Sequence, residues 1–185
     1  KAFYHKQIQK MFRATAYFIP CVTNHTVGDV STFEKPSIII ANHQSHLDLM
    51  YLLMLSPKII VLTNQWVWRF PIYGKIIRYA DFYPIIDEGI ESSLESLKNL
   101  VAKGYSIAIF PEGTRSADLA IHRFKKGAFY LAEKLKLDIQ PIIFHGIGHV
   151  LNKKEFILQK GTVTIDILPR IASDDISFGA DYSER

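Results

Sequence analysis

Short apolar runs rich in isoleucine recur along this chain and constrain its fold more than any other feature. They occupy residues 38–41, 58–62, 105–110 and 139–144, each four to six residues long. Runs of this length suit buried strands better than helices. Helical spacing of apolar residues appears between them, as in 88–103 and 124–135. This alternation predicts an α/β fold with one domain, in which helices flank a mixed, largely parallel central sheet.

The 185 residues suffice for one domain with a full core. We expect residues 1–22 to begin with an amphipathic helix, 23–170 to form the folded domain, and 171–185 to be a polar tail. The first helix mixes large apolar side chains with lysine and arginine. Such a helix lies in a membrane interface or packs on the core, and both alternatives stay open.

Other strands are expected around the central runs. Residues 38–41 and 58–62 should form a βαβ unit, and residues 82–86 a short strand. Residues 22–37 read as a connection with one weak strand at most. Toward the end, 156–158 and 162–168 predict a hairpin.

Composition excludes several classes of function. The net charge of +4 and a pI of about 9.1 are too modest to indicate nucleic acid, but they suit an anionic membrane surface or a phosphate group. A single cysteine, Cys21, excludes an internal disulfide. His145 and His149 have no acidic or thiol ligand beside them, so we predict no metal site.

No apolar run reaches the roughly 18 residues of a membrane span. We expect a peripheral protein on the cytoplasmic face of a membrane. The chain begins with Lys1, which leaves open that it is part of a longer membrane protein.

The motif NHQSHLD, residues 42–48, directly follows the run 38–41. Ligand sites in open α/β sheets lie where strands end and helices begin. His43 is therefore a candidate base, and Asp48 a carboxylate that fixes its tautomer. The same letters also fit a capping box with Ser45 as N-cap and Asp48 in the first helical turn. From the residues alone, both interpretations stand.

A second motif, FPEGTRS, covers residues 110–116 and again follows an apolar run. It combines a carboxylate, Glu112, with a glycine that lets backbone approach a ligand, Gly113, and with Arg115, whose guanidinium suits an oxyanion. A surface turn with a Glu112–Arg115 ion pair is the more frequent arrangement, and the motif taken by itself favours it.

Together the two motifs resemble the glycerolipid acyltransferase family, the lysophosphatidic acid acyltransferase-like (1-acyl-glycerol-3-phosphate acyltransferase) enzymes. The stretch 124–128 and Pro141 extend the similarity. The resemblance implies an acyl thioester donor, either acyl-CoA or acyl-carrier protein, a lysophospholipid or other lipid-like acceptor, and no cofactor. It makes His43 the general base and Asp48 its orienter. It assigns acceptor binding to Glu112, Gly113, Thr114 and Arg115.

The chemistry agrees with that assignment. A thioester is already activated, so a positioned base is enough for direct attack by an acceptor hydroxyl. We also expect the amino end of the helix after NHQSHLD to stabilise the developing oxyanion. A thioester or lipid hydrolase, in which His43 activates water, and a non-catalytic lipid-binding module remain as alternatives.

The sequence departs from the family pattern at Asp87, which stands where an arginine is usual. A carboxylate there repels a phosphomonoester. This predicts a different acceptor selectivity, for a neutral, zwitterionic or amine-bearing acceptor.

Overall fold

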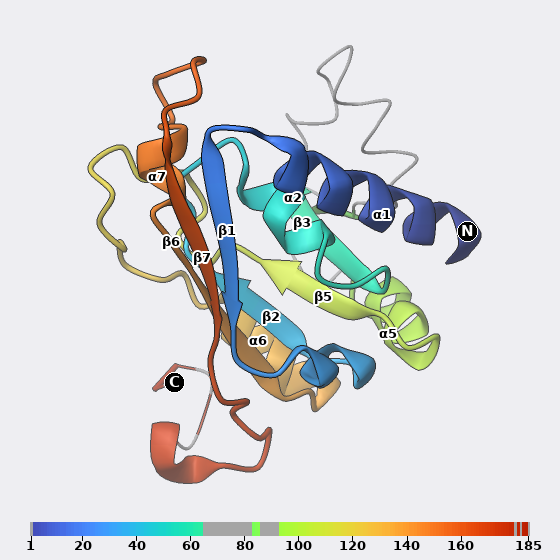
Figure 1. The fold of residues 1–185 in the computed structure, drawn as a ribbon. Coiled ribbons are helices and arrows are strands. Elements are labelled where there is room, and N and C mark those ends of the chain that lie inside the picture. The colour runs from blue at the N-terminus through green and yellow to red at the C-terminus, as the bar shows by residue number, and fades with distance from the viewer. Residues whose placement is uncertain (1, 65–82, 86–92, 180, 182, 185) are drawn as a thin grey trace.

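The computed structural model describes residues 2–64, 83–85, 93–179, 181 and 183–184. Seven strands form one sheet in the order β1-β7-β6-β2-β5-β3-β4 (Figure 1). The strands are β1 (Val22–Val27), β2 (Ile38–Ala41), β3 (Ile59–Asn64), β4 (Tyr83–Ile85), β5 (Ser106–Ile109), β6 (Ile139–His145) and β7 (Gly161–Ile167). The helices are α1 (Ala2–Phe18), α2 (Asp48–Leu53), α5 (Leu94–Ala102), α6 (Gly127–Leu135) and α7 (Ile147–Val150), with 3-10 turns η1 (Val30–Glu34) and η3 (Ile176–Phe178).

The predicted single α/β domain with a mixed, largely parallel sheet is confirmed. Strands β6, β2, β5, β3 and β4 all run parallel to one another. The pairing of β6 with β7 is antiparallel, and β1 then runs parallel to β7. The segments 38–41 and 58–62 became parallel strands, but β5 lies between them, so their βαβ unit skips one position in the sheet.

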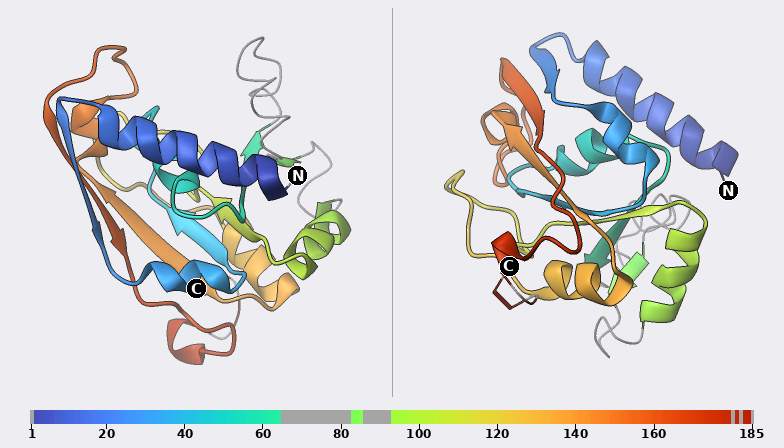
Figure 2. Two further views of the ribbon diagram at one scale, coloured as in Figure 1. Left: turned by 45° about the vertical axis from the view of Figure 1, so that its right-hand side comes forward. Right: turned by 90° about the horizontal axis from the view of Figure 1, so that it is seen from below.

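Alternate residues of the central strands point to opposite faces, which creates two cores. Ile39 and Ala41 of β2 face α1 and α2, whereas Ile38 and Ile40 face α5 and α6. Figure 2 shows the sheet between these two helical layers. Burial on both faces explains why the central strands are continuous apolar runs.

The hairpin predicted for 156–158 and 162–168 is wrong. Residues 161–167 form β7, but it pairs with β6 and β1 instead. Its alternating Val163, Ile165 and Ile167 are buried in the core, which requires a place inside the sheet. The run 156–158 is too short to compete and stays exposed outside any strand. The connection 22–37 correspondingly holds a full strand, β1.

The predicted N-terminal helix is confirmed as α1. One face of this helix packs on the core and the opposite face is exposed. His5 and Ala16 are buried, and Ile8 and Phe12 pack against the core, at spacings of one helix face. The Gln9 side-chain amide also donates to the Met54 and Leu55 carbonyls, at 3.3 Å each. The opposite face is exposed and includes Phe3, Met11 and Phe18. Packing on the core therefore leaves an apolar face free for other contacts.

The aromatic-rich stretch 65–79, in which Pro71 and Gly74 predict short interrupted helices, lies outside the described residues, and so does Asp87. The short strand expected at 82–86 is present as β4. Within the described part of the chain, no helix is both long and apolar enough to cross a membrane.

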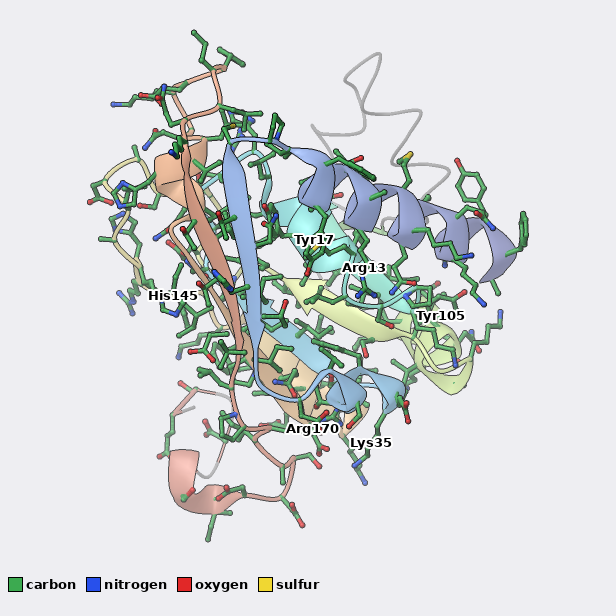
Figure 3. All side chains as sticks on the ribbon, viewed as in Figure 1. Arg13, Tyr17, Lys35, Tyr105, His145 and Arg170 are labelled. Carbon is green, nitrogen blue, oxygen red and sulfur yellow. The ribbon has the colours of Figure 1, made fainter. Side chains whose placement is uncertain are left out.

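Asp138, at the start of β6, ties the lower end of the sheet together. Its carboxylate accepts from Lys35 at 3.0 Å, from Arg170 at 3.2 Å and from the Ser173 amide at 3.1 Å. Figure 3 shows Lys35 and Arg170 side by side at this end of the molecule. Burial alone raises the pKa of Asp138, but these hydrogen bonds outweigh it and hold the pKa below the ordinary 3.8.

Replacing this carboxylate should expose its contribution to stability. We expect Asp138→Asn to lower the free energy of unfolding by about 1–3 kcal/mol at neutral pH, measured by urea denaturation. Because the folded-state pKa is depressed, the contribution is fully present above 3.8 and is lost as the pH falls below it. The difference from the unaltered protein should therefore narrow in acid. Glu95→Gln, which removes an exposed pair with Lys98, is the control and should change little.

Candidate active site

Parallel pairing of β2 with β5 brings the two sequence motifs together. Ile38 is in register with Ile107 and Ile40 with Ile109, so both strands end at the same edge. NHQSHLD leaves the end of β2 and FPEGTRS leaves the end of β5. The Ser116 amide donates to the His43 carbonyl at 2.7 Å, which fastens one loop to the other. The predicted convergence at a strand-to-helix junction is thus present.

His43 and Asp48 form a tight pair. The distance from His43 Nδ1 to Asp48 Oδ2 is 2.6 Å, and the Asp48 side chain is fully buried. A carboxylate only accepts, so Nδ1 carries the hydrogen and Nε2 presents a lone pair. Nε2 has no hydrogen-bonding partner among the described residues, and the His43 side chain is 23% exposed. An imidazole held in this way can accept a proton at Nε2 from a group bound beside it.

The His43 ring is also fixed by stacking. It lies on the Phe110 ring with centroids 4.1 Å apart and planes inclined by 16°. Phe110 is the residue directly after β5, so the second motif supplies a wall for the base in the first. Stacking and the bond to Asp48 together restrict both ring torsions of His43.

Asp48 serves the backbone as well as the ring. Its Oδ2 accepts from the amides of Gln44 at 2.7 Å and Ser45 at 2.9 Å. The capping-box interpretation is wrong in detail, because α2 begins at Asp48 and Leu47 is its N-cap. The Ser45 hydroxyl instead donates to the Leu151 carbonyl at 2.7 Å and accepts the Leu47 amide. One carboxylate thereby both closes the turn and orients His43.

The amides just before α2 are already used by the turn. Those of Gln44 and Ser45 donate to Asp48, and that of Leu47 donates to the Ser45 hydroxyl, so these three are not available to a developing oxyanion. Stabilisation of an oxyanion by the amino end of α2 itself stays a prediction.

Glu112 lies beneath the site. It is buried, with Oε1 accepting the His43 amide at 2.8 Å and Oε2 accepting the His122 amide at 3.1 Å. Both oxygens are therefore engaged by this chain's own backbone, and Glu112 is a positioning residue for His43. Its direct contact with an acceptor stays a prediction.

Gly113 and Thr114 form the exposed part of FPEGTRS. Gly113 has a φ of +71°, and a Cβ built there would lie 2.6 Å from Lys125 Nζ. A side chain at this position is disfavoured by its backbone conformation. Thr114 is exposed, and Lys153 Nζ lies 3.4 Å from its hydroxyl and 2.9 Å from the Arg115 carbonyl. Cationic groups thus gather around this turn.

The surface-turn interpretation of FPEGTRS predicted an ion pair between Glu112 and Arg115. Among the described residues this pair is not formed, because the Glu112 oxygens accept backbone amides instead. The Arg115 guanidinium donates to His46 Nδ1, and His46 Nε2 lies 3.0 Å from the Lys153 carbonyl. A carbonyl only accepts, so this arrangement requires the Nε2–H tautomer of His46. His46, which a sequence pattern does not distinguish from a solvated residue, therefore positions Arg115.

The segment after FPEGTRS is held close to the site by short polar contacts. The Gln44 side-chain amide donates to the Leu119 carbonyl at 2.6 Å. The Ser116 hydroxyl and the Ala120 amide donate to Asp118, and these bonds lower the pKa of that exposed carboxyl to about 2, with a smaller effect from His122. The segment thus stays folded beside the NHQSHLD turn.

Asn42 and Lys153 are site residues that sequence reasoning missed. The Asn42 side chain exchanges two hydrogen bonds with Phe144, through its amide to the carbonyl at 3.1 Å and through its oxygen from the amide at 2.8 Å. It extends the pairing of β2 with β6 beyond Ala41. Asn42 could have been identified from its place as the first residue of NHQSHLD. Lys153 lies far from both motifs in the sequence, so no sequence pattern pointed to it.

No group of three or more histidine, cysteine, aspartate or glutamate side chains in the described ranges is arranged to hold a metal ion. The side chains that the site does bring together are one oriented imidazole, His43, and the cations of Arg115, Lys125 and Lys153.

Comparison with known proteins decides the family. A family model described as Acyltransferase matches residues 8–145, from within α1 to the end of β6. The chain belongs to the acyltransferase family. Both motifs and all central strands of the parallel part of the sheet fall inside the matched span. The resemblance inferred from NHQSHLD and FPEGTRS is confirmed.

Curated relatives carry more specific names. The chain is 34% identical to the chloroplast 1-acyl-sn-glycerol-3-phosphate acyltransferase of Arabidopsis thaliana over 138 residues, which are 72% of this chain and 39% of that protein. It is 30% identical to the 1-acyl-sn-glycerol-3-phosphate acyltransferase of Saccharomyces cerevisiae over 159 residues, 82% of this chain and 52% of the relative. The chain thus spans about half or less of these relatives' length.

A solved structure shares the fold. It is the crystal structure of the 1-acyl-sn-glycerophosphate acyltransferase PlsC from Thermotoga maritima, with a TM-score of 0.78 at 24% identity. The similarity covers 94% of this chain and 70% of that one.

Glu112→Gln tests the positioning role assigned to Glu112. The amide nitrogen of glutamine would face a backbone N–H at either His43 or His122, since both carboxylate oxygens are acceptors. We expect a loss of about 1–3 kcal/mol in the free energy of unfolding, measured by chemical denaturation. Glu155→Gln, an exposed change, should leave the stability unaltered. Equal stability of both variants would contradict the role.

Proposed function

We propose that this protein transfers a fatty acyl group from an acyl thioester to the hydroxyl of a lysophospholipid, with His43 as general base. The observation that supports it is the buried Asp48 carboxylate on Nδ1, which leaves Nε2 free to take a proton. The acyl donor is acyl-CoA or acyl-carrier protein, and no cofactor takes part.

The reaction follows from the orientation of the ring. Nε2 removes the proton of the acceptor hydroxyl as its oxygen attacks the thioester carbonyl carbon. Asp48 stabilises the imidazolium that forms. Collapse of the tetrahedral intermediate breaks the carbon–sulfur bond, and the departing thiolate receives the proton from His43. The products are an ester and a free thiol, and no covalent acyl-enzyme is required.

We infer that 1-acyl-sn-glycerol-3-phosphate is the acceptor. The relatives bear its name, and the cations of Arg115, Lys125 and Lys153 gather at the FPEGTRS turn. Arginine and lysine are the residues that bind phosphate. Asp87 acts in the opposite sense, and we propose that it limits the preference for a phosphomonoester over a neutral acceptor.

We further propose that the protein works as a peripheral protein on the cytoplasmic face of a membrane. The free face of α1 carries apolar side chains, and the helix bears Lys6, Lys10 and Arg13 but no acidic residue. This combination suits the interface of an anionic bilayer. Figure 3 shows Arg13 and Tyr17 on this helix.

His43→Ala tests the mechanism. We expect acyl transfer to fall by about 10²- to 10⁴-fold, the usual contribution of a positioned base. The assay follows thiol release from long-chain acyl-CoA and acyl-carrier protein, with the lipid product identified by mass. His25→Ala, in an exposed position on the edge strand β1, is the control and should retain full activity.

The same assay separates the alternatives. Free fatty acid that depends on His43 and forms without an acceptor would establish a hydrolase instead. Ligand binding without any thiol release from either donor would establish a lipid-binding module.

Asp87→Arg tests acceptor selectivity. Replacing a carboxylate by a guanidinium should raise the turnover of 1-acyl-sn-glycerol-3-phosphate relative to monoacylglycerol by about tenfold, since it converts a repulsion into an attraction. The measurement is the ratio of kcat/KM for the two acceptors. An unchanged ratio, with the phosphate-bearing acceptor already preferred by the unaltered protein, would remove Asp87 from acceptor selection.

A further inference from the structure

The loop between α7 and β7, residues 152–160, exposes large apolar side chains that its own fold does not use. Phe156 is 89% exposed and Ile157 is 74% exposed, and Leu158 is also accessible. The loop projects from the molecule beyond α7, at the opposite end from η3 (Figure 1). Clustered apolar exposure of this kind marks an interaction site.

Basic side chains surround this apolar tip. Lys153 and Lys154 precede it and Lys160 follows it, against a single acidic residue, Glu155. Apolar side chains that protrude from a basic rim match the two layers of an anionic lipid surface, headgroup and acyl chain.

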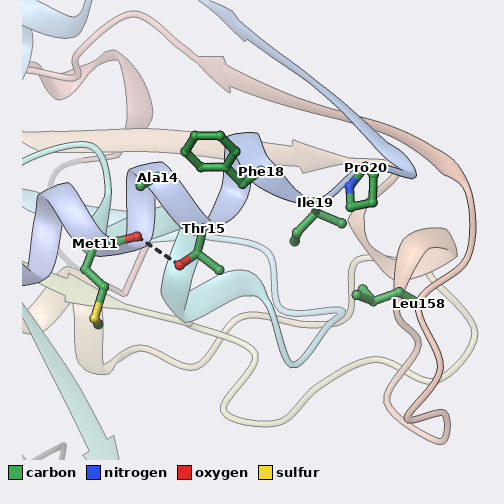
Figure 4. Close-up of a pocket in the computed structure, with 7 residues that line it drawn as sticks. All are labelled: Met11, Ala14, Thr15, Phe18, Ile19, Pro20 and Leu158. Carbon is green, nitrogen blue, oxygen red and sulfur yellow. Dashed lines mark hydrogen bonds between the residues drawn. The ribbon is translucent and has the colours of Figure 1, made fainter.

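The loop also shares a groove with α1. An open groove of about 510 Å³ is lined by Met11, Ala14, Thr15, Phe18, Pro20 and Leu158, among others (Figure 4). Leu158 faces the carboxyl end of α1 across it. The groove therefore joins Leu158 of the loop to the exposed apolar face of α1.

The base of the loop is bonded to the candidate active site. Ser45 forms a β-bridge with Asn152, and the Ser45 hydroxyl donates to Leu151. Lys153 contacts the Arg115 carbonyl and His46, while the Phe156 ring lies 5.8 Å from the His46 ring. A partner surface that binds the loop tip would therefore lie next to the turn that holds Arg115.

We propose that the loop 152–160 inserts Phe156 and Ile157 into an anionic lipid surface, as a second anchor beside α1, and sets the mouth of the active site on that surface. This deepens the proposed function and rests on it for the acceptor: a lysophospholipid in the same surface reaches His43 without crossing water. Charge complementarity and the shared groove favour lipid over a protein partner.

Ile157→Glu tests the anchor, with Ile176→Glu as matched control. Ile176 is 77% exposed on η3, so the same apolar side chain is replaced in an equally open position at the other end of the molecule. We expect Ile157→Glu to weaken binding to phosphatidylcholine vesicles that contain phosphatidylglycerol by at least about tenfold in a sedimentation assay. Ile176→Glu should bind as the unaltered protein does.

A label tests insertion without any need for turnover. Because Cys21 is the sole cysteine, Cys21→Ser permits an environment-sensitive fluorophore to be attached at Ile157→Cys or at Ile176→Cys. The emission from position 157 should shift to shorter wavelength when phosphatidylglycerol vesicles are added, and that from 176 should not. Vesicle binding without a response at 157 would overturn the proposal.

Activity then separates this inference from the proposed function. Ile157→Glu should lower acyl transfer to a vesicle-borne acceptor and leave transfer to a short-chain, monomeric acceptor unchanged. Insertion without any acyl transfer would refute the function and retain the anchor. Unchanged vesicle affinity, with lost affinity for acyl-carrier protein or lost self-association, would refute the anchor.

Discussion

The parallel pairing of β2 with β5 is the constraint on which the site depends. Parallel neighbours end at one edge, so two motifs nearly seventy residues apart in the chain emerge side by side. Burial on both sheet faces fixes this register, because a slip by one residue would exchange the isoleucines of the two cores. The geometry of the site is thus fixed by the packing of the whole sheet between its two helical layers.

Two buried carboxylates, Asp48 and Glu112, fix the position of His43 between the two motifs. Asp48 binds the His43 ring and two amides of its own turn, and Glu112 reaches from the other motif to the His43 amide. Backbone amides donate to Asp48 Oδ2 and to both oxygens of Glu112, which offsets the cost of burying these charges, although Asp48 Oδ1 is buried without a hydrogen-bond partner among the described residues. The His43 ring is therefore oriented from both loops, and moving either loop would move the ring.

Exposed cationic and apolar side chains lie around the His43–Asp48 pair. Arg115 is held through His46, and His46 through the Lys153 carbonyl, so the cationic turn depends on a loop from the far end of the chain. That loop carries the apolar tip, and α1 carries the other apolar face. A few hydrogen bonds thereby join the His43 turn to the exposed apolar side chains of the loop 152–160.

The sequence by itself determined the central strands and the helix α1, because local patterns of apolar residues encode them, and it offered His43 and Asp48 as a candidate pair that the structure brings to 2.6 Å. Only the tertiary structure decided that β7 joins β6 and β1 instead of forming a hairpin, since strand pairing depends on partners distant in the chain. It also decided the roles of Glu112, His46 and Lys153. A polar side chain's role is set by the neighbours that folding brings to it, and no spacing along the chain records them.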